Sequence, residues 1–190
     1  MTDQLLFPGM SAPRLTDGLF FALFPDAAAA ARIGGLTRRL RDAHALSAAP
    51  HAADRLHVSL HGIGEYPAFP KEIAAGAIAA AASVALPPFE IAFDRALSFS
   101  GKPGRLPLVL RSHDGFAGVM ALQQALGAAL AKAGLAARPS TPHLTLLYDV
   151  RRVEEQPIDP VGWTVRDFVL VHSLLGQTRY IPLGKWPLCG

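Results

Sequence analysis

The chain has very little cysteine and no long uninterrupted apolar run. Its 190 residues include a single cysteine, Cys189, so no intrachain disulfide can form and nothing favours an oxidising compartment. Asp3 stands where a signal peptide would carry a basic residue, and Pro8 interrupts the apolar residues around it. The alanine-rich stretches are broken by proline and glycine. We therefore expect a cytoplasmic protein with no membrane span.

Strong charge and the common phosphate and zinc motifs are absent too. The net charge of +3 suits an anionic ligand without requiring one. The densest basic group, Arg38, Arg39 and Arg41, is more typical of a solvated helix face than of a duplex-binding stripe. No glycine-rich loop leads into Lys-Ser/Thr, and no Cys-x-x-Cys occurs. With 51% hydrophobic residues, one globular domain spanning 1–190 is expected.

A four-residue pattern occurs twice in the chain. Residues 57–60 (HVSL) and 143–146 (HLTL) both read histidine, apolar, hydroxyl, leucine, and they begin 86 positions apart (143 − 57). Both lie in segments with strand character, where alternate side chains point to opposite faces. Each segment therefore presents its histidine and hydroxyl on one face and buries two apolar side chains on the other.

The other patterns predict a mixed order of strands and helices. Strands are expected near residues 19–24, 55–63, 89–93, 96–99, 106–111, 143–150, 164–174 and 179–182. Helices are expected from Asp26 to 43–46, from Pro70 to Pro87, and from Ser112 or Asp114 to Gly134. Ile78 and Met120 belong to their expected buried stripes. This order indicates an α+β protein of two βαβ-like lobes, with the two histidine strands lining the cleft between them.

Two histidines and two hydroxyls on facing strands can perform phosphate chemistry. Imidazole titrates near neutral pH, so one of His57 and His143 can take a proton from water while the other donates one to a leaving oxygen. The hydroxyls of Ser59 and Thr145 can donate hydrogen bonds to phosphate oxygens, which stabilises charge in the transition state. Such a reaction needs neither a metal nor another cofactor.

Further side chains could join this site. Strand alternation places His61 on the face of Ser59, where it could line the substrate pocket or form a three-histidine metal site with His57 and His143. Phe20 or Phe21 could stack on a base, although a first-strand phenylalanine is more often a core residue. Arg111 and Lys102 could reach a phosphate from the edge of the cleft, although cations in such positions are usually solvated.

These residues resemble the paired His-x-Thr/Ser motifs of the 2H phosphoesterase superfamily, and most closely its 2′-5′ RNA ligase branch, the RNA 2′,3′-cyclic phosphodiesterases. The resemblance covers most of the chain. It rests on residues 19–23 (LFFAL), 56–65 (LHVSLHGIGE), 142–146 (PHLTL) and 170–173 (LVHS), with Tyr180 and Trp186 as weaker support.

The resemblance implies a bilobal 2H phosphoesterase-like α+β fold with pseudo-twofold symmetry, in which antiparallel or mixed sheets line a central cleft and helices lie outside. It also implies metal-independent opening of a 2′,3′-cyclic phosphate to a 2′-phosphate, with His143 as the base and His57 as the acid. Ser59 and Thr145 would hold the phosphate, and Ser173 would face the cleft. RNA ends or small nucleotide cyclic phosphates would be the substrates of a monomer, and reversible 2′-5′ ligation would accompany hydrolysis.

The chain departs from the family pattern at two points. Ser59 replaces the commoner threonine and keeps its hydroxyl, but no basic residue follows the second motif until Arg151. Two other functions therefore stay open. One is a non-catalytic protein of the same fold that binds RNA ends or nucleotides. The other is a metal-dependent hydrolase that uses His57, His61 and His143.

Overall fold

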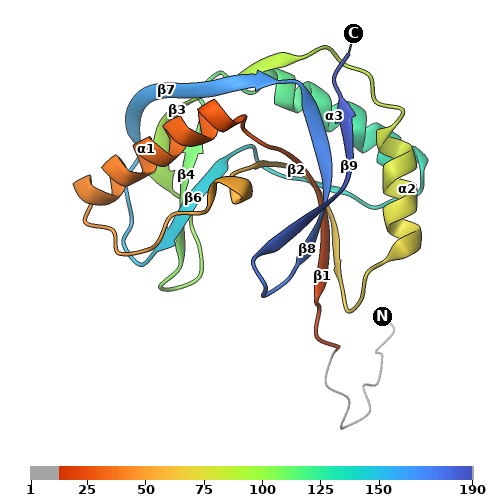
Figure 1. The fold of residues 1–190 in the computed structure, drawn as a ribbon, viewed down its shortest axis with the longest axis horizontal. Helices are drawn as coiled ribbons and strands as arrows, with labels where there is room; N and C mark the ends of the chain where they lie inside the picture. Colours follow the sequence, from red (N-terminus) through yellow and green to blue (C-terminus); the bar gives the residue numbers. More distant parts are fainter. Residues whose placement is uncertain (1–12, 190) are drawn as a thin grey trace, which may run out of the picture.

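The computed structural model describes residues 13–189 and contains three α-helices and nine strands in this range (Figure 1). In chain order the elements are β1 (Asp17–Leu23), α1 (Ala27–Ala43), β2 (Val58–Tyr66), α2 (Lys71–Ala81), β3 (Phe89–Ser98), β4 (Leu106–Arg111), α3 (Ala117–Lys132), β5 (Arg138–Pro139), β6 (Leu144–Asp149), β7 (Gln156–Val165), β8 (Asp167–Leu174) and β9 (Arg179–Pro187). A short 3₁₀ turn, Ala53–Arg55, precedes β2. Our interpretation of Asp3 and Pro8 lies outside the described residues.

The strands form one curved sheet in the order β7-β3-β4-β6-β2-β1-β8-β9, and β5 pairs with β2. Every pairing found between the described strands is antiparallel, so the expected α+β fold is confirmed, and strands that a helix connects, such as β1 and β2, pair antiparallel rather than parallel as in a true βαβ unit. The order reads as two four-stranded halves, β6-β4-β3-β7 and β2-β1-β8-β9, which meet where β6 lies beside β2. The expected two-lobed arrangement is therefore present, as two halves of one sheet.

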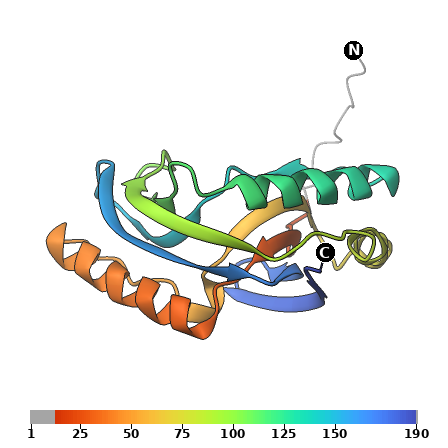
Figure 2. The ribbon, with the colours of Figure 1, turned by 90° about the horizontal axis from the view of Figure 1, so that it is seen from above.

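The helices lie outside this sheet. Figure 2 shows α3 along one side of the curved sheet and α1 along the other, with α2 at one end. α1 connects β1 to β2 but contacts β7 in the other half, where Arg32 Nη2 donates to the Gly162 carbonyl at 2.6 Å. α3 connects β4 to β6 but contacts β2. Each of these helices thus crosses from one half to the other and helps to hold the halves together.

Local sequence explains most helix boundaries. Asp26 caps α1 because its Oδ1 accepts from the Ala29 N–H at 2.7 Å, and the helix continues through Gly34 and Gly35. The stripes that we predicted for α2 and α3 are partly wrong, since Ile78 is 37% exposed and Met120 is 56% exposed. α2 instead buries the alanines 74, 77, 80 and 81, whose small side chains permit close packing.

Proline obscured one strand in the sequence. We expected a proline-containing loop before residue 164, but Gln156–Val165 forms β7 with Pro157 and Pro160 inside it. β7 is an edge strand, where a residue without an N–H is tolerated. The strands expected at 89–93 and 96–99 are one strand, β3, with a register shift between Phe93 and Arg95.

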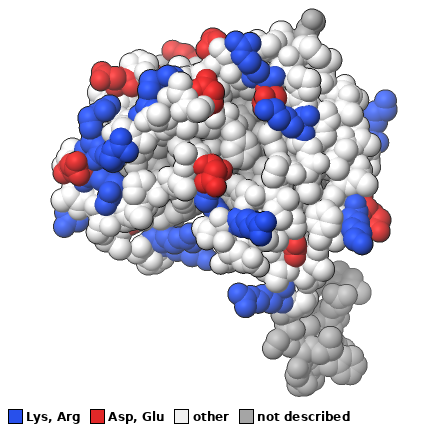
Figure 3. All heavy atoms as spheres, in the orientation of Figure 1, with Lys and Arg blue, Asp and Glu red and all other residues white. Residues whose placement is uncertain are grey.

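Charge on the surface is interspersed. Figure 3 shows basic and acidic side chains scattered over one face, with acidic groups among the basic ones. This agrees with the modest net charge and with the lack of a duplex-binding stripe in the sequence. None of the helices in the described part of the chain has the length and apolar character needed to cross a bilayer.

Candidate active site

The two histidine motifs meet at the junction between the halves of the sheet. Val58, the first residue of β2, pairs with Leu144, the first residue of β6, in antiparallel register. His57 and His143 directly precede these two residues, so each histidine stands at the start of its strand rather than inside it. Residues that are 86 positions apart in the chain therefore become neighbours at the centre of the molecule, where β2 and β6 adjoin in Figure 1.

Antiparallel register also sets which side chains of the motifs face each other. Continuing the pairing by one residue in each direction places Ser59 opposite His143 and His57 opposite Thr145. Cross-strand neighbours on one face have Cβ atoms about 5 Å apart. Each imidazole thus stands across from the hydroxyl of the other motif, on the face away from Val58 and Leu144, which are buried.

The two imidazoles are oriented by equivalent hydrogen bonds. His57 Nδ1 lies 2.7 Å from the Arg55 carbonyl oxygen, and His143 Nδ1 lies 2.7 Å from the Thr141 carbonyl oxygen. A carbonyl oxygen can only accept, so both Nδ1 atoms carry the hydrogen and donate it. Each Nε2 is left to accept a proton when the ring is neutral or to donate one when it is charged.

The surroundings of His57 favour its neutral form. The pKa of this imidazole is lowered from 6.5 to about 4, mainly by burial; the hydrogen bond to the Arg55 carbonyl opposes the shift, and the charges of Arg55, His143 and His51 add to it. With this pKa, the His57 ring is uncharged at neutral pH.

A cavity of about 860 Å³ opens beside His57 and Ser59. Phe20 and Tyr180 line it, with ring centroids 5.2 Å and 5.5 Å from that of His57. Ser173, which is paired with Gly18 of β1, also lines it. The structure therefore brings four of the expected site residues, Phe20, His57, Ser59 and Ser173, to one cavity.

His143 has a comparable neighbourhood in the other half of the sheet. The centroid of the Phe99 ring lies 5.1 Å from that of the His143 ring, and the Arg111 guanidinium lies over the Phe99 ring, 5.9 Å from its centroid. Thr145 is partly exposed and is paired with Val109 of β4. Each histidine therefore has an aromatic ring and an arginine near it, which places positive charge on both sides of the junction.

His61 does not belong to this group, and our expectation that it shares the face of Ser59 is wrong. Ser59 pairs with Ala22 while His61 pairs with Phe21, so two steps on β2 match one step on β1. This β-bulge reverses the alternation of side chains and turns His61 to the helix side. There it is 4% exposed, and its Nε2 lies 2.8 Å from the Gln123 carbonyl of α3.

The three-histidine metal site consequently does not assemble, because His61 lies on the opposite side of the sheet from His57. No group of three potential metal-ligating side chains of the His, Cys, Asp or Glu type occurs among residues 13–189. The metal-dependent alternative therefore loses the ligand set on which it depended.

Gln123 ties the two motifs together from beneath the sheet. Its Nε2 donates to the Leu60 carbonyl at 2.9 Å and to the Ser140 carbonyl at 2.7 Å, and the Ser140 N–H donates to the same Leu60 carbonyl at 3.0 Å. One acceptor adjoins Ser59, and the other lies three residues before His143. Gln123 lies in the buried stripe of α3 with Val119 and Leu126, and a polar residue at such a position is the signal from which this role could have been found.

Arg55 and Tyr180 were missed as site residues. Arg55 Nη2 donates to the Tyr180 hydroxyl at 3.1 Å, and the guanidinium lies 4.2 Å from the Tyr180 ring centroid. Their signals in the sequence were weak. Arg55 precedes the strand, and Tyr180 comes from a hairpin that is distant in the chain.

Comparison with known proteins agrees with this geometry. A model of the 2′-5′ RNA ligase superfamily matches residues 24–176, whereas no curated protein matches the chain significantly. A solved structure described as a phosphoesterase is 27% identical, with 92% of this chain and 99% of that one covered and a TM-score of 0.70. E. coli LigT complexed with NADP+ is 28% identical, with 93% and 100% covered and a TM-score of 0.68. TT0787 of Thermus thermophilus, at 23% identity, 91% and 98% coverage and a TM-score of 0.69, supports the fold alone.

LigT has also been solved with 3′-AMP, with ATP and with phosphate. The family match and these structures confirm the resemblance that the paired motifs indicated, and they support an enzyme of phosphoesterase or ligase type. The chain belongs to the 2′-5′ RNA ligase superfamily.

Proposed function

We propose that the protein is a metal-independent phosphodiesterase that opens 2′,3′-cyclic phosphates to 2′-phosphates. The observation that carries this proposal is the equivalent placement of His57 and His143, each with Nδ1 donating to a backbone carbonyl at 2.7 Å on either side of the Val58–Leu144 pair. Two imidazoles with free Nε2 atoms on one face are what acid–base attack on a phosphodiester requires.

In this reaction His143 takes a proton from water, and the water oxygen forms a bond to phosphorus. The bond from phosphorus to the 3′ oxygen breaks, and His57 donates its proton to that oxygen. Ser59 and Thr145 donate hydrogen bonds to the non-bridging oxygens, where charge develops in the transition state. If the 5′-hydroxyl of a second RNA end takes the place of water, the same steps form its bond to phosphorus as the bond to the 3′ oxygen breaks, and the product is a 2′-5′ phosphodiester; the reverse of those steps restores the cyclic phosphate and the free hydroxyl.

The low pKa of His57 restricts when this residue can serve as the acid. Because its pKa is about 4, the ring is neutral near pH 7 unless a further negative charge lies beside it. A bound phosphodiester places a negative charge beside the ring, and a nearby opposite charge favours the protonated form. We infer that His57 takes up its proton together with the substrate.

The substrates of this proposal are RNA ends or small nucleotides that carry a 2′,3′-cyclic phosphate. The nucleotide complexes of LigT support a nucleotide ligand, because that protein shares the fold over 93% of this chain. Both histidines come from the same chain, so a monomer suffices for the chemistry. We retain the cytoplasm as its expected location.

Hydrolysis of a panel of cyclic phosphates in the presence of EDTA tests the proposal. The panel holds 2′,3′-cyclic mononucleotides and short RNAs with 2′,3′-cyclic ends, and mass spectrometry identifies the products. We expect 2′-phosphates from the wild type and a loss of at least about 100-fold in kcat/KM for His57→Asn and for His143→Asn, the scale of general acid–base catalysis.

Full activity in either variant would contradict the two-histidine mechanism. Tight binding of the 2′-phosphate product without turnover of any substrate would instead identify a non-catalytic binding protein. Activity lost in EDTA and restored by zinc would identify a metal-dependent enzyme.

A further inference from the structure

A β-bulge in β6 turns Tyr148 onto the catalytic face of the sheet. Leu147 pairs with one residue of β4 and Thr145 pairs with the next one along, so Leu146 is an extra residue in β6. The extra residue reverses the alternation of side chains, and Tyr148 therefore shares the face of Thr145 rather than that of the buried Leu147. Tyr148 is 37% exposed there, and the mechanism proposed above makes no use of it.

The bulge also holds the segment that runs from α1 to β2. The carbonyl of the bulged Leu146 accepts from the His51 N–H at 2.7 Å, and the His51 ring stands edge-on to the Tyr148 ring with the centroids 5.6 Å apart. Six residues further along, the same segment reaches His57, whose imidazole is oriented by the Arg55 carbonyl. Tyr148 thus contacts the segment that carries one of the two catalytic histidines.

The loop between β3 and β4 also docks on the Tyr148 ring. Arg105, at the end of this loop, places its guanidinium 4.3 Å from the centroid of the Tyr148 ring, which is a cation–π contact. Phe99, at the start of the loop, packs against His143 with the ring centroids 5.1 Å apart. The loop therefore joins Tyr148 to the second catalytic histidine, and Tyr148 contacts the segments that reach both.

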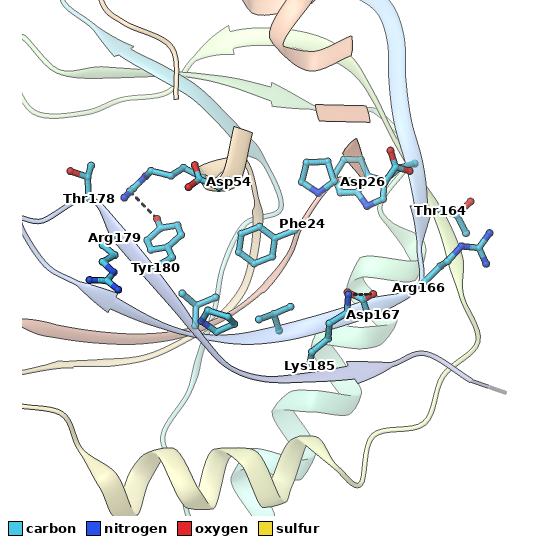
Figure 4. A pocket seen from close by; sticks show the side chains of 16 residues that line it. Phe24, Asp26, Asp54, Thr164, Arg166, Asp167, Thr178, Arg179, Tyr180 and Lys185 are labelled. Atoms are coloured by element: carbon cyan, nitrogen blue, oxygen red, sulfur yellow. Dashed lines mark hydrogen bonds and ion pairs between the residues drawn. The ribbon is translucent and has the colours of Figure 1, made fainter. Parts of the chain in front are cut away.

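The ionisable groups around this cluster are consistent with its place beside the junction of the two halves. Burial lowers the pKa of His51, and the charges of Arg55 and Arg105 lower it further. Burial raises the pKa of Tyr180, Arg55 opposes that rise, and Tyr148 adds to it. Tyr180 belongs to β9 in the other half, where its hydroxyl accepts from Arg55 (the dashed line at Tyr180 in Figure 4). Tyr148 therefore lies near side chains of both halves.

We propose that Tyr148 is a positioning residue for catalysis, because its ring holds the two segments that reach His57 and His143. This inference rests on the proposed function, since it concerns the alignment of the same two imidazoles. A displacement of about 1 Å in a catalytic group can cost about 100-fold in rate, so a ring on which both segments dock has a large effect on turnover. The contacts use the Tyr148 ring rather than its hydroxyl, so phenylalanine should serve equally well at this position.

The test compares kcat and KM of Tyr148→Leu and Tyr148→Phe on adenosine 2′,3′-cyclic phosphate. Leucine removes the ring, so we expect kcat to fall by roughly tenfold or more with a smaller change in KM, as for a displaced catalytic group. Tyr148→Phe keeps the ring and should keep the wild-type kcat. Phe69→Leu is the matched control and should also keep it, because Phe69 is 36% exposed and packs on His172 of β8.

Arg105→Gln tests the loop side of the contact. It removes the guanidinium from the Tyr148 ring, so kcat should fall, and its effect should add little to that of Tyr148→Leu in the double variant, because both changes break the same contact. It also removes a charge that lowers the pKa of His51, so an NMR titration should show that pKa rising. Arg38→Gln, a change of an exposed arginine on α1, should alter neither quantity.

An NMR measurement without substrate separates this inference from the proposed function. The ring current of Phe99 shifts the resonances of the His143 ring, so release of the loop should move them in Tyr148→Leu but not in Tyr148→Phe. Wild-type kcat or unchanged His143 resonances in a folded Tyr148→Leu protein, or equal losses in Tyr148→Phe, would overturn the inference. Absence of hydrolysis by the wild type, with these NMR differences present, would overturn the proposed function instead.

Discussion

At the scale of single residues, the surroundings of His57 couple its protonation to the binding of an anion. The bond from His57 Nδ1 to a backbone carbonyl favours the charged ring, but burial and neighbouring charges hold the pKa of His57 near 4. A bound anion raises that pKa, so the protonated ring and the anion stabilise each other. Proton uptake and anion binding at this residue are therefore thermodynamically linked.

Sulfate binding tests this linkage, because the charge of sulfate is constant between about pH 5 and 8, the range in which histidine charge changes. Affinity should rise as the pH falls through the pKa of the complexed His57, and calorimetry in buffers of different ionisation enthalpy should show proton uptake. In His57→Asn the rise should shrink, whereas in His113→Gln, a change of an exposed histidine, it should persist. A pH-independent affinity in the wild type would refute the linkage.

At the scale of elements, α3 positions β2 and the segment before β6 through one side chain, Gln123. Gln123 Nε2 donates hydrogen bonds to the Leu60 carbonyl, which belongs to β2, and to the Ser140 carbonyl, which belongs to the segment that leads to His143. Replacing Gln123 with methionine keeps the length of the side chain but leaves both carbonyls without this donor. We expect kcat to fall by about 10- to 100-fold with a smaller change in KM, as for a displaced catalytic group.

The neighbouring Gln124 provides the control, because it lies on the same helix and is exposed. Gln124→Met should keep the wild-type kcat. Circular dichroism should show that both variants are folded. A folded Gln123→Met protein with the wild-type kcat would show that Gln123 has no positioning role.

Elements also mark the limits of prediction from the sequence. The repeated motif predicted that two distant strands meet, because a buried apolar face and a shared polar face are encoded in strand alternation. Strand alternation put His61 on the wrong face, because the bulge at Leu60 arises from the pairing of β2 with β1 and is not encoded in the sequence of β2 alone. Pro157 similarly suggested a loop, because its tolerance depends on the edge position of β7.

At the scale of the whole molecule, Asp149 joins segments about a hundred residues apart. Its carboxylate accepts from the backbone N–H groups of Ser47, Ala48 and Arg151 at 2.8–2.9 Å, linking the end of β6 to the loop after α1. Hydrogen bonds from the Arg151, Ala48 and Ser47 N–H groups hold the pKa of Asp149 below 3.8. The charged form is therefore the one that stabilises the fold.

Asp149→Asn should lower the free energy of unfolding by about 2 kcal/mol, the scale of hydrogen bonds to a charged group. The stabilisation by Asp149 is complete above pH 3.8 and is lost as the pH falls through the lowered pKa, so the difference between the proteins should narrow in acid. Urea unfolding at neutral pH and in acid below that pKa measures both effects. Equal stability at neutral pH would contradict this role.

The acceptors of the two histidine bonds are main-chain atoms, and this has an evolutionary consequence. Every amino acid supplies a carbonyl, so no substitution at Arg55 or Thr141 can delete the group that orients the ring beside it. The side chains at these two positions can therefore vary without loss of the hydrogen bonds that orient the imidazoles. The chain can change residue 55 to suit a new ligand while the imidazole two residues later keeps its hydrogen bond.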